Sequence, residues 1–480
     1  MRLLDSPVVR SLVRVPPTIP LDDVLAATGG RLERPTSVTS ITGASVDSRR
    51  VSPDSCFVAL NGERVDGHDF VAAALRAGAI AALVDRPIEL SRNVDAAVVL
   101  VSDPLIALQE LAAWWRLRHD VRVVGVTGST GKTIGKEMIA DVLSRTLRTL
   151  RNEGNLNSET GLPMTLLRLT AEHEAAVLEM SMYTVGEIAR LAEIAVPEVG
   201  VVLAVHPTHL QRAGSIELIA HAKAELPRSL PRHGLAVLNA DDPRVEPMRD
   251  VTSARVRTFG LGSGADVRAE GLASRGLDGM EYTLRAPWGS RRVVSATPGR
   301  HLVPHQLAAA AVGEWFGVPL DEVVASLGVG SHAPHRMHLV EAASGARLVD
   351  DTYNASPISM AAALDFLAET PLRPGHRRLA VLGDMLELGP DEERLHREIG
   401  ARAAAAAPDG VVTVGERGRW IAEGARAAGA VTVIIASDAQ EAAASLEREL
   451  APGSGDLVLL KASRGIGLER AVDALLQGAR

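Results

Sequence analysis

The stretch "VRVVGVTGSTGKTI", residues 121–134, decides the fold of this chain. Its first half is a β-branched run expected to form a strand, and its second half is a glycine-rich turn ending in Lys132 and Thr133. Glycines let the backbone curl so that its N–H groups converge on phosphate oxygens, while a lysine reaches the β- and γ-phosphates and a threonine hydroxyl binds Mg²⁺. The strict pattern has Gly or Ala where this chain has Val126. We predict a nucleotide-binding loop formed by Gly128, Ser129, Thr130, Gly131, Lys132 and Thr133, followed by a helix beginning near Ile134.

Apolar segments around this loop predict an α/β protein. Residues 175–180, 198–205 and 234–240 are continuous apolar runs, which indicates buried parallel strands. Residues 262–297 alternate instead, which favours an antiparallel excursion. Further strands are expected at 377–384, 410–416, 431–437 and 455–463.

The chain is long enough for several domains, because 480 residues exceed what one hydrophobic core usually serves. Shifts in pattern near residue 117 and near residue 331 divide it into three. We therefore expect three α/β domains at 1–117, 118–330 and 331–480.

Composition limits the partners. The formal net charge of -8 gives no basic surface for nucleic acid, and no apolar run approaches the roughly 18 residues that a membrane-spanning helix needs. Cys56 is the only cysteine, which excludes an intrachain disulfide. We expect a cytoplasmic protein that acts on small molecules, binds no nucleic acid, does not insert into membranes and is a monomer, although the sequence does not fix the oligomeric state.

Polar residues at strand ends suggest a metal site beside the loop. Glu179 follows one apolar run, and His206 and His209 follow the next, at the edge where open α/β sheets bind ligands. Lys223 lies on an apolar helical stripe with Ile216 and Ile219. Its ammonium either snorkels to water or, if buried, loses its charge and becomes nucleophilic.

With these residues the chain resembles the Mur ligases, the ATP-dependent amide-forming enzymes of peptidoglycan precursor synthesis. "SVDSRRVSPDSCFVALNGERVDGHDF" (45–70), "GNLNSETGLPMTLLRL" (154–169), "VLNADDPRV" (237–245), "DDTYNASPISM" (350–360) and "VLGDMLELG" (381–389) carry the resemblance. It is strongest to the members that add D-Ala-D-Ala to UDP-MurNAc-tripeptide. The resemblance implies a small N-terminal substrate domain, a central phosphate-loop ATPase domain with a mostly parallel sheet and a Rossmann-like C-terminal domain.

The resemblance also implies ligands for two Mg²⁺ ions and for ATP. Thr133 and Glu179 would hold one Mg²⁺ ion. His209 and a CO₂-derived carbamate on Lys223 would hold the other. Arg336 would reach the ATP phosphates and Asp351 the ribose, after the C-terminal domain closes. Lys132, Lys223, His209 and Arg336 are the expected catalytic residues.

Substrate contacts are implied in each domain. Ser48 and Arg49 correspond to the UDP site, and Asn157, Ser158 and Glu159 to the central substrate site; Asn354 and Ser356 are candidates for the dipeptide site. From the residues alone, Arg49 could equally be a surface charge and Asn157 a helix cap. Turn-forming roles for Asn354 and Ser356 also remain open.

This chain departs from the family where adenine binds. Leu302 and His305 stand where two asparagines are usual, and a neutral His305 could restore one hydrogen bond. Ala204 and Ala462 replace a usual asparagine and glycine.

Two other functions remain open. One is another amide ligase of the superfamily, such as the diamino-acid-adding type. The other is a non-catalytic nucleotide-binding relative. The sequence also leaves open whether the tripeptide ends in lysine or diaminopimelate, and whether D-Ala-D-lactate is accepted.

Overall fold

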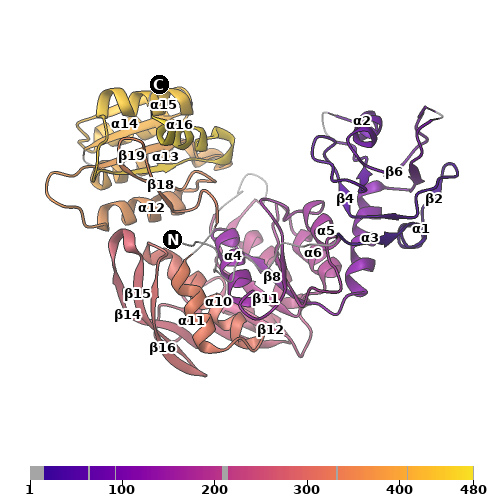
Figure 1. The fold of residues 1–480 in the computed structure, drawn as a ribbon. Helices are drawn as coiled ribbons and strands as arrows, with labels where there is room; N and C mark the ends of the chain where they lie inside the picture. Colours follow the sequence, from indigo (N-terminus) through magenta and orange to yellow (C-terminus); the bar gives the residue numbers. More distant parts are fainter. Residues whose placement is uncertain are drawn as a thin grey trace, which may run out of the picture.

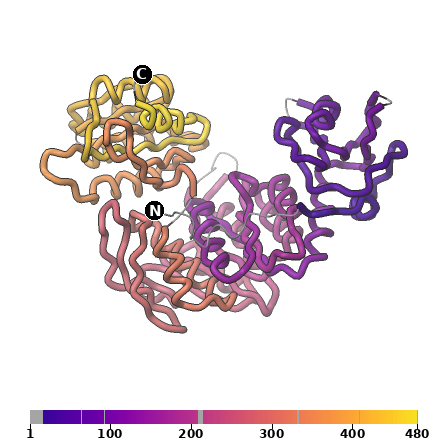
Figure 2. The backbone as a smooth tube through the Cα atoms, in the orientation of Figure 1, coloured from indigo at the N-terminus to yellow at the C-terminus, as the bar shows by residue number. Residues whose placement is uncertain are grey.

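The computed structural model describes residues 16–62, 65–91, 93–207, 214–330, 333–407 and 409–478. They form three lobes in an open arc, each built around one large β-sheet, with the central lobe between the other two (Figure 1 and Figure 2). The predicted α/β class with three domains is confirmed. Within these ranges, none of the helices combines the length and apolar character that crossing a bilayer requires.

The N-terminal lobe is a five-stranded sheet in the order β2-β7-β6-β5-β4. Only the pairing of β2 with β7 is antiparallel. The strands are β2 (Arg31–Leu32), β4 (Ala44–Ser45), β5 (Cys56–Val58), β6 (Ala81–Val84) and β7 (Ala97–Leu100), and a separate pair joins β1 (Ile19–Pro20) to β3 (Ser40–Ile41). The helices are α1 (Leu21–Thr28), α2 (Val71–Arg76) and α3 (Pro104–Leu117).

The central lobe is a nine-stranded sheet in the order β16-β15-β14-β13-β12-β11-β8-β10-β9. Its parallel strands are β8 (Arg122–Thr127), β9 (Thr149–Arg151), β10 (Ala175–Glu179), β11 (Val199–Val202), β12 (Leu235–Asn239), β13 (Arg255–Gly260) and β14 (Val267–Ser274). The antiparallel excursion is β14 with β15 (Met280–Ala286) and β16 (Gly289–Ser295), as predicted. The helices are α4 (Lys132–Leu143), α5 (Gly161–Leu166), α6 (Glu187–Ala195), α8 (Ile216–Lys223), α9 (Glu225–Ser229), α10 (Val303–Trp315) and α11 (Leu320–Val329).

The C-terminal lobe is a six-stranded sheet in the order β17-β18-β22-β19-β20-β21, antiparallel only between β17 and β18. The strands are β17 (His338–Glu341), β18 (Arg347–Asp350), β19 (Arg378–Gly383), β20 (Gly410–Val414), β21 (Val433–Ala436) and β22 (Leu457–Lys461). The helices are α12 (Pro357–Glu369), α13 (Glu392–Ala406), α14 (Gly418–Ala427), α15 (Ala439–Ser445) and α16 (Glu469–Gln477).

The turn between β8 and α4 is set by Gly131. Its φ of +76° lies in the left-handed region, which costs a residue with a Cβ free energy but glycine very little. Gly131 is also the N-cap of α4, so this helix begins at Lys132 rather than near Ile134 as predicted. The first turn of α4 therefore includes Lys132 and Thr133.

Helix α3 joins the N-terminal and central lobes. The Trp115 indole donates to the Leu169 carbonyl at 3.1 Å, and Arg116 donates to the Ala195 carbonyl at 2.8 Å. One buried apolar cluster runs from α1 and the N-terminal sheet through α3 to β10 and α6. Because α3 packs on both lobes, it does not mark a sharp limit at 117, and the limits at 117 and 331 both stay predictions.

Candidate functional site

The phosphate loop lies at the carboxyl end of β8 and is fastened to the end of β11. The Ser129 N–H donates to the Ala204 carbonyl at 2.8 Å. The Ser129 hydroxyl donates to the His206 carbonyl and accepts from the His206 N–H, both at 2.9 Å. The Lys132 ammonium donates to the Gly128 carbonyl at 2.9 Å. Desolvation lowers the pKa of Lys132 below its ordinary value, the Glu179 carboxylate opposes this shift, and Arg336 adds to it.

Thr133 and Glu179 meet beside the loop. The Thr133 hydroxyl donates to Glu179 Oε2 at 2.9 Å, and the Asn157 amide donates to Glu179 Oε1 at 2.6 Å. Glu179 is buried at the end of β10. The interpretation of Asn157 as a helix cap is wrong, because Thr160 occupies the N-cap position of α5. These three side chains form one hydrogen-bonded unit with oxygen atoms suited to a hard cation.

Lys223 ends helix α8 and is only 3% exposed. Its ammonium therefore does not snorkel to water, and among the described residues it has no hydrogen-bond or ion-pair partner. Burial lowers the pKa of Lys223 well below its ordinary value, and the Lys132 ammonium lowers it further. His209, the other predicted ligand at this point, lies outside the described residues. The described residues contain no cluster of three His, Cys, Asp or Glu side chains placed to hold a metal ion.

The C-terminal lobe brings Arg336 to the phosphate loop. Arg336 Nη2 donates to the Thr133 hydroxyl at 3.0 Å, and its guanidinium lies 4.3 Å from the centre of the Tyr353 ring. The Nε atom of Arg336 is buried without a hydrogen-bond partner. The structure thus places this predicted residue where the phosphate loop and the C-terminal lobe meet.

Asp351 lies at the carboxyl end of β18 in a buried ion pair. Its Oδ2 is 2.5 Å from the Lys461 ammonium, which also donates to the Asn354 carbonyl at 2.9 Å. The Asn354 side chain accepts from the Ala355 N–H at 2.9 Å. Ser356 is the N-cap of α12 and forms a capping box. Asn354 and Ser356 therefore have local, turn-forming contacts in this structure.

His305, in the first turn of α10, packs against the phosphate loop. A Cβ added at Gly131 would lie 1.8 Å from His305 Nε2, so only glycine allows this approach. His305 Nδ1 is buried without a hydrogen-bond partner. Burial lowers the pKa of His305 to about 4, with a further contribution from His301. The imidazole is thus neutral at physiological pH and retains an unused polar atom, whereas Leu302 is buried among apolar residues.

The predicted UDP-site residues are not brought to the loop. Ser48 and Arg49 lie in a turn after β4, in the lobe at the right of Figure 1. The Arg49 side chain is 86% exposed and pairs with Asp47 at 2.8 Å, which lowers the pKa of the Asp47 carboxyl to about 2.

Ser158 and Glu159 lie nearer to the loop than the UDP-site turn does. The Ser158 hydroxyl is 3.2 Å from that of Thr160, just before α5. The Glu159 carbonyl accepts from Gln109 of α3 at 3.2 Å. This turn therefore links α3 to the Asn157–Glu179 unit.

Two residues of this site were missed by sequence reasoning. Lys461 is a lysine within an apolar strand, a signal like the one that marked Lys223 on its helix. Asn152, which contacts the Glu179 backbone, lies in a polar turn and carries no such signal.

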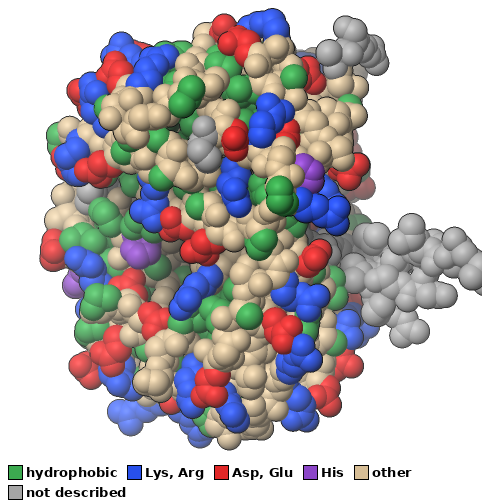
Figure 3. Space-filling view, turned by 90° about the vertical axis from the view of Figure 1, so that its left-hand side faces the viewer, with side chains coloured by type: hydrophobic (Ala, Val, Ile, Leu, Met, Phe, Trp, Pro, Cys, Tyr) green, Lys and Arg blue, Asp and Glu red, His purple; other side chains and the backbone are tan. Residues whose placement is uncertain are grey.

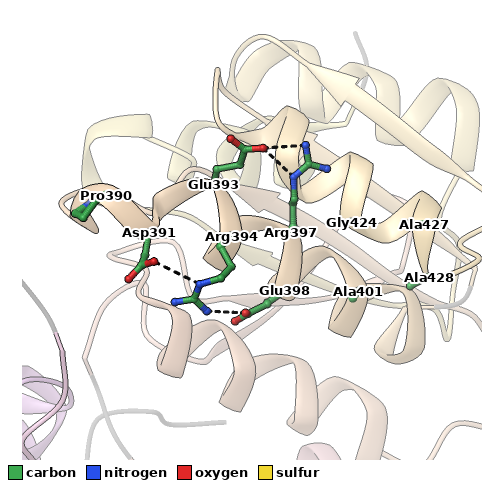
Figure 4. Close-up of a pocket in the computed structure, with 10 residues that line it drawn as sticks. All are labelled: Pro390, Asp391, Glu393, Arg394, Arg397, Glu398, Ala401, Gly424, Ala427 and Ala428. Atoms are coloured by element: carbon green, nitrogen blue, oxygen red, sulfur yellow. Dashed lines mark hydrogen bonds and ion pairs between the residues drawn. The ribbon is translucent and has the colours of Figure 1, made fainter.

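A surface groove lies elsewhere, between α13 and α14 (Figure 4). Its side chains are largely paired with one another: Arg394 with Asp391 and Glu398, and Arg397 with Glu393. The groove is separate from the phosphate loop.

Charged side chains of both signs are mixed on the surface. Figure 3 shows Lys and Arg side chains interspersed with Asp and Glu over one face of the molecule.

The fold and the site define a three-domain phosphate-loop protein. Sequence profiles of the Mur ligase family match most of the chain: "Mur ligase family, catalytic domain" at 40–116, "Mur ligase middle domain" at 126–313, and "Mur ligase, glutamate ligase domain" at 335–464. The chain belongs to the Mur ligase family.

Individual ligases and solved structures are similar to this chain over most of its length. The UDP-N-acetylmuramoyl-tripeptide–D-alanyl-D-alanine ligase of Escherichia coli strain K12 is 38% identical, over 91% of this chain and 94% of the relative. The enzyme of that name from Bacillus subtilis strain 168 is 36% identical, over 92% of this chain and 94% of the relative. Crystal structure I of MurF from Acinetobacter baumannii covers 97% of this chain and 100% of its own, with a TM-score of 0.85 and 32% identity. The crystal structure of MurF ligase from Thermotoga maritima in complex with ADP matches 91% of this chain and 97% of its own chain, with a TM-score of 0.77 and 30% identity.

Proposed function

We propose that this chain is an ATP-dependent ligase that adds D-Ala-D-Ala to UDP-MurNAc-tripeptide in the cytoplasm, as a step of peptidoglycan precursor synthesis. The relatives named above support the reaction. The observation that carries it is the buried group at the phosphate loop. Thr133 bonds Glu179 and accepts from Arg336 of the C-terminal lobe, and Lys132 is near enough to the buried Lys223 to lower its pKa. A protein that only binds nucleotide has no need of Lys223 in that position.

Each domain then has one task. Residues 1–117 hold the UDP moiety, with Ser48 and Arg49 as contacts. Residues 118–330 bind ATP and the reacting end of the tripeptide, with Asn157, Ser158 and Glu159 near that end. Residues 331–480 bring the dipeptide and Arg336 to the loop, with Asn354 and Ser356 as dipeptide contacts.

ATP is held by the central lobe, which carries the phosphate loop and His305, and by the C-terminal lobe, which carries Arg336 and Asp351. The loop N–H groups and Lys132 bind the phosphates, which the helix dipole of α4 also favours. The unpartnered Arg336 Nε and His305 Nδ1 are polar atoms available to the nucleotide. His305 contacts the adenine and Asp351 the ribose in this proposal.

Two Mg²⁺ ions are part of this proposal, and the described residues offer ligands for the first of them. Thr133 and Glu179 offer hydroxyl and carboxylate oxygens for the first. For the second, the uncharged form of the Lys223 amine, which burial favours, would add to CO₂ and release one proton to give a carbamate. His209 would complete this ligand pair. When bound, the ions neutralise phosphate charge in the reaction.

The reaction has two steps. The terminal carboxylate of the tripeptide attacks the γ-phosphate, and ADP leaves an acyl phosphate behind. The amine of the dipeptide then displaces inorganic phosphate and forms the amide. Lys132 and Arg336 supply positive charge and position the phosphate groups for the attack.

A phosphate-release assay tests this function. The purified chain receives Mg²⁺ and ATP with UDP-MurNAc-tripeptide, D-Ala-D-Ala, both or neither. We expect release only with both substrates. Equal release without the dipeptide would contradict the ligase. Release with UDP-MurNAc-L-Ala-D-Glu and a diamino acid would favour another member of the superfamily. Adding lysine-ended and diaminopimelate-ended tripeptides, and D-Ala-D-lactate, defines the specificity.

A further inference from the structure

Asn152 lies where strand β10 runs past its neighbour. Strand β9 pairs with β10 only as far as Val177, which is opposite Arg151. On its other side, β10 remains paired with β8 through Glu179. The N–H and C=O of Glu179 that face the β9 side therefore lack a strand partner, although buried backbone groups require one.

The Asn152 side chain provides both partners. Its Oδ1 accepts from the Glu179 N–H at 2.9 Å, and its Nδ2 donates to the Glu179 C=O at 3.2 Å. The same Nδ2 donates to the Leu156 C=O at 2.8 Å. Asn152 is 1% exposed, and both of its amide protons are used. A single side chain thus extends the β-ladder by one step to the residue that bears the site carboxylate.

Helix α4 holds Asn152 in turn. Lys136 lies one turn after Lys132 and is fully buried, and its ammonium donates to the Asn152 C=O. Lys136 also pairs with Glu137 at 2.7 Å, and Glu137 pairs with Arg151 at 2.8 Å. The helix that begins at the phosphate loop is thereby connected to Glu179. We call Lys136 and Asn152 the brace.

We propose that Asn152 is a positioning residue of the ligase: through the brace it fixes the Glu179 backbone so that the carboxylate faces Thr133. This rests on the proposed function, in which Thr133 and Glu179 hold Mg²⁺. The Glu179 carboxylate is oriented by Thr133 and Asn157, but these contacts form only if the backbone of Glu179 is held in place. Loss of a group that orients a metal ligand typically lowers metal affinity by about 10- to 100-fold.

The test is the substitution Asn152→Leu, which keeps a similar volume and removes both hydrogen-bonding groups. The measurement is the Kd of ADP by calorimetry, with and without Mg²⁺, because their ratio reports the metal site without requiring turnover. We expect the Mg²⁺ enhancement of ADP binding to fall by about tenfold or more. The KM for D-Ala-D-Ala should stay unchanged. Asn93→Leu, at an exposed turn of the N-terminal lobe, is the matched control and should retain the wild-type ratio.

A second variant separates positioning from folding. Lys136→Met removes the ammonium that holds the Asn152 carbonyl, and we expect a smaller loss of the Mg²⁺ enhancement. The double variant should lose less than the product of the single effects, because both act through one brace. A lower unfolding temperature with an unchanged Mg²⁺ enhancement of ADP binding would overturn the proposal. If Asn152→Leu does not fold, the same measurement on Lys136→Met tests the proposal in its place. Absent ligase activity in a wild-type chain with normal Mg²⁺-dependent ADP binding would count against the proposed function instead.

Discussion

The phosphate-loop edge of the central lobe and the Ser48–Arg49 turn of the N-terminal lobe are built in opposite ways. At the first, Glu179 and Lys223 are almost fully buried, and contacts arrive from several elements. At the second, Arg49 is exposed and its partner is Asp47, two residues away. Buried polar groups demand fixed partners, whereas exposed ones can exchange protein contacts for water or ligand. The loop edge is thus held by contacts from several elements, whereas the Ser48–Arg49 turn has only local ones.

This difference predicts the largest loss at Lys223. Lys223→Ala removes both the buried amine and any carbamate made from it, and phosphate release should fall by at least about 10²-fold, as for other lost charge-stabilising groups. Formate or acetate should partly restore the activity. His221→Ala, an exposed position on the same helix, is the control and should remain active. A fully active Lys223→Ala would remove this residue from the mechanism.

A substitution of Arg336 tests whether a contact from the C-terminal lobe is part of the phosphate-loop site. Arg336→Ala removes the cation that hydrogen-bonds Thr133, and kcat should fall by about 10- to 100-fold. Steady-state phosphate release at saturating substrates measures this effect. Arg373→Ala, exposed in the same lobe, serves as the comparison. An unchanged kcat for Arg336→Ala would mean that this residue has no part in the phosphate chemistry.

The Ser48–Arg49 turn should show a weaker effect of a different kind. Arg49→Ala removes one charged hydrogen-bond donor, so the KM for UDP-MurNAc-tripeptide should rise about tenfold. The kcat should stay near that of wild type, because the turn is not part of the phosphate-loop site. Arg76→Ala on α2 provides the matched exposed arginine. A fall in kcat without a change in KM would break the contrast between the two regions.

Acid should lower the thermal stability of the protein through His301 and His305, and this is the smallest expected effect. Burial lowers the pKa of His301 and of His305 to about 4, below the value of about 6.5 expected in the unfolded chain. Unfolding then takes up protons, so the stability that both histidines contribute is present above about pH 6.5 and is lost as the pH falls toward about 4. Thermal unfolding as a function of pH should show this slope. His305→Asn should flatten it, and an unchanged slope would contradict the assignment.

The sequence was sufficient for the features that depend on local pattern. The strands around residues 121–134 and the antiparallel excursion follow from periodicity within a few residues. Periodicity placed Lys223 on an apolar stripe but left open whether its ammonium is buried, and the structure shows the residue buried. Helix α4 began two residues earlier than expected, because the conformation of Gly131 rather than the apolar pattern sets its start. Capping of α12 by Ser356 was one of two open interpretations, and the structure shows that contact.

Contacts between distant segments could not be predicted. Lys461 and Asp351 are 110 residues apart and meet only because β22 lies beside β18 in the sheet. Asn152 reaches Glu179 because β9 is shorter than β10 at that edge. Periodicity reports which face of an element is buried but not which element covers it. The roles of Asn157, Arg336 and His305 toward ligands therefore stay predictions that the variants above can test.

Helix α3 sets the separation between the N-terminal lobe and the phosphate loop. It is wedged between two lobes by Trp115 and Arg116, and its Gln109 touches the turn that carries Glu159. Under the proposed function, a substrate anchored by its nucleotide in the first lobe would have to span the separation that α3 sets before its carboxylate reached the phosphate loop. If the proposed UDP site is correct, the length of the peptide that reaches the phosphates is then limited by how firmly this one helix joins the two lobes.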